Sequence, residues 1–149
     1  LIEALNEDII DIIGSDHAPH SLAEKTRPYL QSSSGGPIVQ HMLPLLLELY
    51  HKKELSLTKI VTKTSHQVAT RFQIKKRGFL REGYFADLVL VDPNSKSFIK
   101  KNHYKCQWTP FEQNSIRDFV VSTWVNGSRV YNKGSFSFES PGKRLEFLA

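Results

Sequence analysis

The sequence predicts an α/β fold in which a strand, a loop and helices are followed by a smaller β-rich part. Three patterns carry this prediction. Residues 9–13 are a short aliphatic run typical of a buried strand, and residues 38–53 place apolar side chains at helical spacing. After residue 75, β-branched and aromatic residues alternate with turn residues, as in short antiparallel strands. The 149 residues are enough for one core of ordinary size.

The aliphatic run ends in a turn that is dense in polar side chains. Gly14 and Ser15 close the run, and Pro19 restricts the backbone of the turn. The turn carries one acid and two imidazoles, Asp16, His17 and His20. Chemistry at the carboxyl end of a buried strand is typical of α/β enzymes, so Asp16 is the first candidate for a functional residue. A lone apolar strand needs neighbouring strands, which we expect outside this chain.

Helices and one long loop follow this turn. We expect a short helical turn at residues 22–25, and after it a loop rich in Ser, Gly and Pro. The helix at residues 38–53 is expected to have Pro37 in its first turn, where a missing N–H costs nothing. Ser56 is the expected N-cap of the next helix, and a further short helix is expected at residues 66–72.

The β-rich part reads as several short strands. We expect a strand–turn–strand unit at residues 78–93 closed by Pro93, a long connection at residues 94–114, a strand at residues 116–125 and an edge strand at residues 136–138. The dipeptide Asn126-Gly127 is the strongest hairpin signal in the chain, because both residues tolerate the positive φ of a tight turn.

Composition narrows the classes of function. The chain carries 20 basic and 15 acidic side chains, for a formal charge of +5. Its lysine clusters lack the interleaved aromatic residues of a nucleic-acid platform, and no apolar run approaches the roughly 18 residues of a membrane span. The single cysteine, Cys106, excludes an intrachain disulfide and fits a reducing compartment. We therefore expect a cytoplasmic protein that binds neither nucleic acid nor membranes.

Four motifs occur in a defined order: GSDHAPH, SSSGGPIVQHMLP, GFLREGYFADLVLVD and VNGSRVY. In this order and spacing the sequence resembles the C-terminal part of the dihydroorotases, which are metal-dependent amidohydrolases. The resemblance implies the C-terminal end of a (β/α)₈ barrel over residues 1–74, with residues 9–13 as its last strand. Residues 75–149 would be the C-terminal part of a small β-sandwich domain. Because the chain starts at Leu1, in what reads as the end of an element, we expect a piece of a longer protein.

The resemblance implies two roles for Asp16, as a metal ligand and as the catalytic proton carrier. A carboxylate beside Zn²⁺ can take a proton from water and return it. The implied cofactor is Zn²⁺, as one or two ions, whose remaining ligands would lie upstream of this chain. The plainer interpretation of Asp16 is a turn residue that bonds to its own backbone.

The implied substrate contacts are His20, Ser34 and Gly35. His20 matches a histidine that binds the substrate's carboxylate, and the other two match a loop that offers backbone groups to the substrate. Without a Cβ, Gly35 would let the backbone approach a ligand closely. Plainer alternatives stay open, with His20 as a cap of the next helical turn and Gly35 as part of a hinge. His17 is expected to orient or pack rather than bind metal, because consecutive side chains diverge.

The other histidines and two loop aromatics are assigned to the surface or to packing: His41, His51, His66, His103, Trp108 and Phe111. His103 and Cys106 have an H-x-x-C spacing, but Zn²⁺ would need two further protein ligands. Six positions depart from the usual family residues: Ser32, Ser33, Gln67, Val68, Gln107 and Gln113. Where the family has glycine at Gln107 and Gln113, a left-handed backbone would be lost or strained.

The resulting hypothesis is a dihydroorotase of pyrimidine biosynthesis, which interconverts N-carbamoyl-L-aspartate and dihydroorotate. In hydrolysis, protonated Asp16 would hand its proton to the leaving ring nitrogen. The expected partners are this small-molecule substrate and a second copy in a homodimer, and the chain alone is expected to be inactive. Two alternatives stay open. One is another cyclic amidohydrolase of allantoinase or hydantoinase type, which His20 disfavours, and the other is a non-catalytic dihydroorotase-like subunit.

Overall fold

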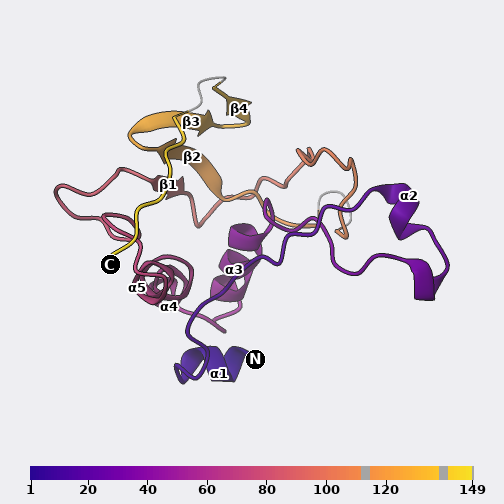
Figure 1. Ribbon diagram of the computed structural model, residues 1–149, viewed down its shortest axis with the longest axis horizontal. Helices are drawn as coiled ribbons and strands as arrows, with labels where there is room; N and C mark the ends of the chain where they lie inside the picture. The colour runs from indigo at the N-terminus through magenta and orange to yellow at the C-terminus, as the bar shows by residue number, and fades with distance from the viewer. Residues whose placement is uncertain (112–114, 138–140, 149) are drawn as a thin grey trace.

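The computed structural model describes residues 1–111, 115–137 and 141–148 (Figure 1). Its helical elements are α1 (Ile2–Asn6), α2 (Leu22–Lys25), the 3₁₀ turn η1 (Tyr29–Gln31), α3 (Met42–His51), α4 (Leu57–Val61), the π turn η2 (Thr62–His66) and α5 (Gln67–Arg71). In the described residues four strands follow, β1 (Leu88–Val91), β2 (Val120–Val125), β3 (Ser128–Asn132) and β4 (Ser135–Phe136). Apart from the strand expected at residues 9–13, helices first and strands second is the predicted order.

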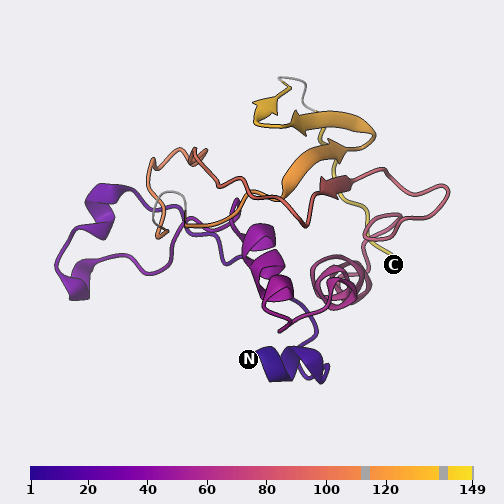
Figure 2. The ribbon, with the colours of Figure 1, turned by 180° about the vertical axis from the view of Figure 1, so that it is seen from behind.

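Helix α3 lies at the centre of the molecule, with α1 and the α4–α5 helix toward one end and the sheet beyond the other (Figure 1). In contrast, α2 stands at the tip of a long loop that projects sideways. The view from behind shows the connection after β1 running beside the loops that lead to and from α2 (Figure 2). Segments far apart in the sequence therefore meet at the base of this projecting loop.

Helix α3 begins later than predicted. The N–H groups of His41 and Met42 both donate to the carbonyl of Ile38, at 2.8 and 3.0 Å, so a separate turn precedes the regular helix. Pro37 lies before this turn rather than in the first turn of the helix, which corrects the prediction. It is fully buried, so packing rather than helix initiation accounts for its place.

One continuous helix replaces the two short helices predicted after Ser56. Ser56 is the N-cap, as predicted, because its Oγ accepts a hydrogen bond from the N–H of Lys59 at 3.1 Å. The π turn η2 joins α4 to α5 without a break. Its sequence is Thr-Lys-Thr-Ser-His, in which most residues have low helix propensity, and the sequence pattern therefore suggested an interruption.

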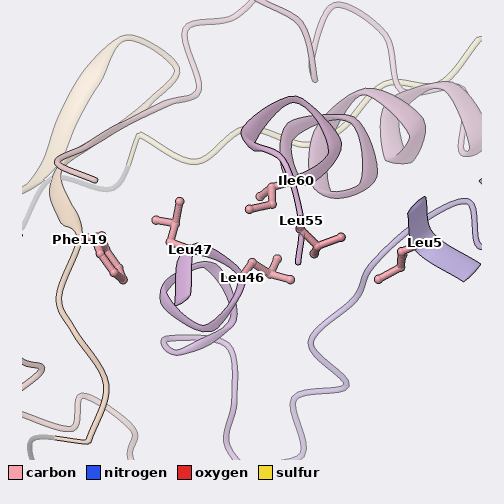
Figure 3. Packing of buried hydrophobic residues seen from close by; sticks show 6 residues of the cluster. All are labelled: Leu5, Leu46, Leu47, Leu55, Ile60 and Phe119. Carbon is pink, nitrogen blue, oxygen red and sulfur yellow. The ribbon is translucent and has the colours of Figure 1, made fainter. Parts of the chain in front are cut away.

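The hydrophobic core lies between the helices and the start of β2 (Figure 3). Its six buried members are Leu5, Leu46, Leu47, Leu55, Ile60 and Phe119. Phe119 is only 1% exposed and Leu47 only 2%. Burying a side chain of this size contributes about 1.5–3 kcal/mol, so this small cluster holds α3 against α4 and against the segment that enters the sheet.

Residues 9–13 do not form the predicted strand. A strand needs a neighbour whose backbone completes its hydrogen bonds, and the described residues place none beside this run. A helix supplies two contacts instead. Ile13 donates its N–H to the carbonyl of Lys63 at 3.0 Å, and the buried ammonium of Lys63 donates to the carbonyl of Ile10. The segment is extended, and Ile9 remains 71% exposed.

The four strands form one antiparallel sheet in the order β1-β2-β3-β4. The predicted hairpin is confirmed, because Asn126 and Gly127 join β2 to β3 and pair Val125 with Ser128. Both turn residues have positive φ, +49° and +87°, as a type I′ turn requires. Sequence therefore identified the turn that sets the register of the central strands.

The other strand predictions hold in part. In the strand–turn–strand unit predicted at residues 78–93, β1 is a strand. The first half of the predicted unit forms turns instead of a strand. The predicted strand at residues 116–125 is shorter, as β2. The predicted edge strand is β4, which pairs with β3, while Phe138 lies outside the described residues. Residues 94–111 form the expected irregular connection, with one bridge between Phe98 and Arg117.

Two charged contacts tie the sheet together and join it to α3. The guanidinium of Arg77 is buried, pairs with Asp87 and donates to Asn126 Oδ1 at 2.8 Å. Arg117 donates to both carboxylate oxygens of Glu48 on α3, at 2.7 and 2.6 Å, and this contact lowers the pKa of Glu48. In the described part of the chain, none of the helices has the length and apolar character needed to cross a membrane.

Candidate functional site

Asp16 lies in the turn after the extended segment, with its side chain exposed. Its backbone has a φ of +45°, which few residues other than glycine adopt and which aspartate tolerates better than most. Within the described residues its carboxylate has no hydrogen-bond partner in the chain. The expected turn-residue alternative would need such a bond to the backbone, so the carboxylate is free to meet a ligand.

His17 fastens this turn to the segment that precedes α3. Its Nδ1 accepts hydrogen bonds from the N–H groups of Ile38 and Val39, at 3.1 and 3.3 Å. An imidazole nitrogen that accepts cannot carry a proton, so the neutral ring has its hydrogen on Nε2. This geometry fits the orienting role expected for His17 and leaves the neighbouring carboxylate of Asp16 unobstructed.

Ser34 and Gly35, the expected substrate contacts, precede Gly36, which is bonded to the turn. His17 and Gly36 form a parallel bridge, and Ala18 donates its N–H to the carbonyl of Gly36 at 3.0 Å. Gly35 has a φ of +85°, and a Cβ at that position would lie 2.7 Å from the Cβ of Ala18. Only glycine fits there, which favours close packing of the two segments over a free hinge.

His20 follows in the same turn, and its backbone is held by the long connection. The indole N–H of Trp108 donates to the carbonyl of His20 at 2.6 Å. Ser21, not His20, caps α2, because Ser21 and Glu24 form a reciprocal capping box. The hydrogen bonds from Ser21 lower the pKa of Glu24. The capping alternative for His20 is therefore wrong, and among the residues that the structure describes its imidazole has no hydrogen-bond partner.

Lys25 was missed by the sequence reasoning, although it makes the strongest contacts to the Ser34–Gly35 loop. Its ammonium donates to the carbonyls of Ser33 and Gly35, at 2.6 and 2.9 Å. The same ammonium lies 5.7 Å from the centre of the Trp108 ring. A basic residue at the end of a four-residue helix was the available signal, but its spacing from the loop gave no reason to pair them.

A second cluster at the base of the site was also missed. The hydroxyl of Tyr104 accepts from the N–H of Gln40 at 2.8 Å and pairs with His41 Nδ1 at 2.9 Å. Burial lowers the pKa of His41 and raises that of Tyr104. His41 also packs on Phe111, with ring centres 4.9 Å apart. The packing role expected of His41 and Phe111 is therefore confirmed, and Tyr104 joins them.

The described residues contain no group of three His, Cys, Asp or Glu side chains that could hold a metal ion. His103 packs on Phe136, and Cys106 contacts the carbonyl of Trp108 at 3.7 Å. A zinc site needs three or four protein ligands. The unpaired carboxylate of Asp16 fits one of them, and the others would have to come from elsewhere.

Three departures from the family pattern have visible consequences. Gln107 adopts a φ of +61°, so the left-handed backbone expected for a family glycine is kept and is occupied by glutamine. Ser32 donates its hydroxyl to the carbonyl of Lys25 at 3.1 Å, and Ser33 supplies a carbonyl to the ammonium. Gln67 and Val68 begin α5, while Gln113 lies outside the described residues.

The sequence matches the amidohydrolase family over residues 1–130. It is 38% identical to the dihydroorotase of Halobacterium salinarum over 139 residues, which are 92% of this chain and 33% of that protein. It is 38% identical to the dihydroorotase of Methanosarcina acetivorans in an alignment that covers 98% of this chain and 34% of that protein. The chain thus spans about a third of the length of these curated relatives.

Solved structures resemble the chain over nearly its whole length. The L-hydantoinase of Arthrobacter aurescens superposes with a TM-score of 0.84 at 26% identity, covering 94% of this chain and 33% of that one. The dihydropyrimidinase of Brevibacillus agri gives a TM-score of 0.81 at 29% identity, covering 91% and 31%.

Proposed function

Because this chain belongs to the amidohydrolase family, we propose that it is the C-terminal third of a dihydroorotase, which interconverts N-carbamoyl-L-aspartate and dihydroorotate. One observation carries the proposal. The turn with the unpaired carboxylate of Asp16 and the imidazole of His20 is hydrogen-bonded to Gly36, which directly follows Ser34 and Gly35 in their loop. Identities of 38% to dihydroorotases support the same substrate.

Asp16 is the proton carrier in this proposal. In hydrolysis, water adds to the amide carbonyl carbon of the dihydroorotate ring, its proton passes to Asp16, and the carbon–nitrogen bond breaks. Asp16 then delivers that proton to the leaving nitrogen, which gives N-carbamoyl-L-aspartate. Ring closure follows the same path in reverse. Asp16 is exposed, and its backbone has a positive φ. Its carboxylate is therefore accessible to a substrate.

The substrate's carboxylate is held by His20 and by backbone groups of Ser34 and Gly35. His20 is free for this task because Ser21 caps the following helix and Trp108 binds only the backbone carbonyl of His20. A carboxylate is best bound by several N–H donors arranged in advance of binding. The close packing of Gly35 against Ala18 keeps this loop at a fixed distance from the turn.

Family membership implies a metal cofactor, and Zn²⁺ fits the proposed chemistry. A bound Zn²⁺ would polarise the amide carbonyl and acidify the attacking water. Asp16 would be one of its ligands, and the remaining ligands would come from the two thirds of the relatives' length that this chain does not span. We further propose that residues 1–74 form the end of a (β/α)₈ barrel and that residues 75–149 form part of a β-sandwich. A cytoplasmic homodimer completes the proposal.

The test is turnover of N-carbamoyl-L-aspartate by the full-length protein, with and without added Zn²⁺. We expect Asp16→Asn to lower kcat by about 10³-fold, because it removes the proton carrier. Asparagine also tolerates a positive φ, so the turn should keep its shape. Asp11→Asn is the matched control, since Asp11 is exposed in the preceding segment. The proposal is wrong if metal-loaded wild-type protein does not turn over N-carbamoyl-L-aspartate. It is also wrong if the Asp16→Asn variant has the wild-type kcat.

The second candidate is a hydantoinase-type cyclic amidohydrolase. The structural resemblance to the L-hydantoinase and the dihydropyrimidinase favours it. A hydantoin or dihydropyrimidine without a carboxylate leaves no partner for His20, whereas dihydroorotate supplies one. A panel of dihydroorotate, dihydrouracil and hydantoin therefore separates the two candidates, with the highest kcat/KM expected for dihydroorotate.

A further inference from the structure

Lys25 is the charged side chain most closely bound to the proposed substrate loop. Its ammonium donates to the carbonyls of Ser33 and Gly35, at 2.6 and 2.9 Å. These two carbonyls flank Ser34, so both peptide groups turn the same face toward Lys25. A loop rich in serine and glycine has little rigidity of its own, so the ammonium adds to the Gly35–Ala18 packing and the Gly36 bridge in fixing its shape.

The direction of these peptide groups matters for ligand binding. In a trans peptide the N–H points opposite to the C=O. Because the carbonyl of Ser33 faces Lys25, the N–H of Ser34 faces away from it. Because the carbonyl of Gly35 faces Lys25, the N–H of Gly36 also faces away from the ammonium, while the carbonyl of Gly36 accepts a hydrogen bond from the N–H of Ala18 in the turn. The ammonium thus decides which side of the loop carries donors and which carries acceptors.

Lys25 is itself held in place from two directions. The capping box of Ser21 and Glu24 fixes the start of α2, and the hydroxyl of Ser32 donates to the backbone carbonyl of Lys25 at 3.1 Å. Trp108 lies beneath the ammonium, with 5.7 Å between Nζ and the ring centre, while its indole N–H holds the carbonyl of His20. His20 and the loop of Ser34 and Gly35 are therefore both connected to Lys25.

We propose that Lys25 is a positioning residue for the substrate, which turns the Ser33–Gly36 backbone so that the amide of Ser34 faces the substrate's carboxylate. The proposal rests on the proposed function for the identity of that substrate. Lys25 does not touch the reacting atoms. It acts through the loop, so its loss should weaken substrate binding more than it slows the chemical step.

The experiment compares Lys25→Met with wild type in the full-length protein. We expect KM for dihydroorotate to rise by ~10-fold with kcat within about threefold, because a charge-assisted contact to the loop is lost before any bond is made. Lys25→Arg keeps a cationic donor and should restore most of the loss. Lys96→Met is the matched control, since Lys96 is exposed and this substitution removes the same charge. A KM for Lys25→Met within twofold of wild type would overturn the proposal.

A second measurement does not depend on the substrate. Hydrogen–deuterium exchange of residues 33–36 in ligand-free protein should become faster in Lys25→Met and stay at the wild-type rate in Lys96→Met. A raised KM without faster exchange in this loop would mean that Lys25 contacts the substrate directly, and would overturn the positioning role. Absence of any dihydroorotate turnover in wild type would refute the proposed function, and the exchange experiment would still decide the role of Lys25.

Discussion

The segment that carries the proposed site and the β-sheet differ in what holds them in shape. Between residues 9 and 41 the chain is mostly irregular, and its key contacts come from far away in sequence. Lys63 binds Ile10 across 53 positions, and Trp108 binds His20 across 88. In the sheet, β2 and β3 pair across a two-residue turn. The comparison teaches that the β2–β3 hairpin is specified by its own turn, whereas the pairing of β1 with β2 and the site both depend on partners far away in sequence.

The largest stability effect is expected in the sheet, at Arg77. Arg77→Met removes the partner of Asp87 and Asn126 and leaves a partly exposed carboxylate without its cation. Breaking a fully buried pair is worth 3–5 kcal/mol, and the exposure of Asp87 reduces this to about 2 kcal/mol of unfolding free energy. Chemical denaturation of the full-length protein measures it. Arg129→Met, on the exposed face of β3, serves as the control.

This substitution also tests the comparison itself. Because Arg77 contacts Asp87, Asn126 and the ring of Phe85 rather than the proposed site residues, the Arg77→Met protein that remains folded should keep the wild-type KM and kcat. If the folded Arg77→Met protein instead has a lower kcat or a higher KM than wild type, the sheet and the site are not independent.

A smaller effect on stability, but a direct one on the site, is expected at His17. His17→Phe keeps a ring and removes the acceptor for the N–H groups of Ile38 and Val39. Leaving partly buried donors unpaired costs about 1–2 kcal/mol. His17→Asn restores an acceptor close to the position of Nδ1. Exchange of the two amides, followed by NMR, should therefore quicken in the phenylalanine variant and recover in the asparagine variant. Equal exchange rates in both variants would contradict the orienting role.

In the long connection we expect a gain of stability from Gln107→Gly. A left-handed backbone is unfavourable for glutamine by about 1 kcal/mol, and glycine removes this penalty while loosening the unfolded chain. The net gain should be about 0.5 kcal/mol, because the Gln107 side chain is exposed. Gln107→Ala keeps the backbone penalty and should give no gain. Comparing the thermal midpoints of the two variants isolates the backbone contribution.

The smallest effect is the acid response of Asp8, whose side chain is largely exposed. Hydrogen bonds from Lys59 and Lys63 lower the pKa of Asp8 from 3.8 to about 2. A lowered folded-state pKa means that the ionised carboxylate stabilises the fold above pH 3.8, and that this contribution disappears as the pH falls toward 2. The difference in unfolding midpoint between wild type and Asp8→Asn should therefore shrink over this range. A constant difference would mean that the ion pairs contribute nothing.

Sequence alone predicted the features whose causes are local. The cap at Ser56, the turn at Asn126-Gly127 and the short helix α2 each depend on neighbours within four residues. The strand expected at residues 9–13 failed for the opposite reason, since a strand depends on backbone partners that the described residues do not place there. The apolar composition of a segment indicates that it is suited to burial, but it does not show whether a neighbouring strand is present to pair with it.

The same division applies to the candidate site. Asp16 and His20 were proposed because they crowd one turn, and their roles, with those of Ser34 and Gly35, stay predictions. Lys25, Tyr104 and Trp108 were missed as site residues. Each contacts a backbone group or a ring that only folding brings near. The sequence around a lysine or an aromatic residue in a loop does not predict such a contact.

The position of Trp108 gives the protein a natural optical reporter. This chain has two tryptophans, Trp108 at the site and Trp124 in β2. Indole emission responds to nearby charge and hydrogen bonding, and Trp108 has both, in the ammonium of Lys25 and the carbonyl of His20. Trp124→Phe would leave the signal of Trp108 alone in this chain. Fluorescence at one wavelength would then follow the arrival of an anion at the turn in real time, without a label or a coupled assay.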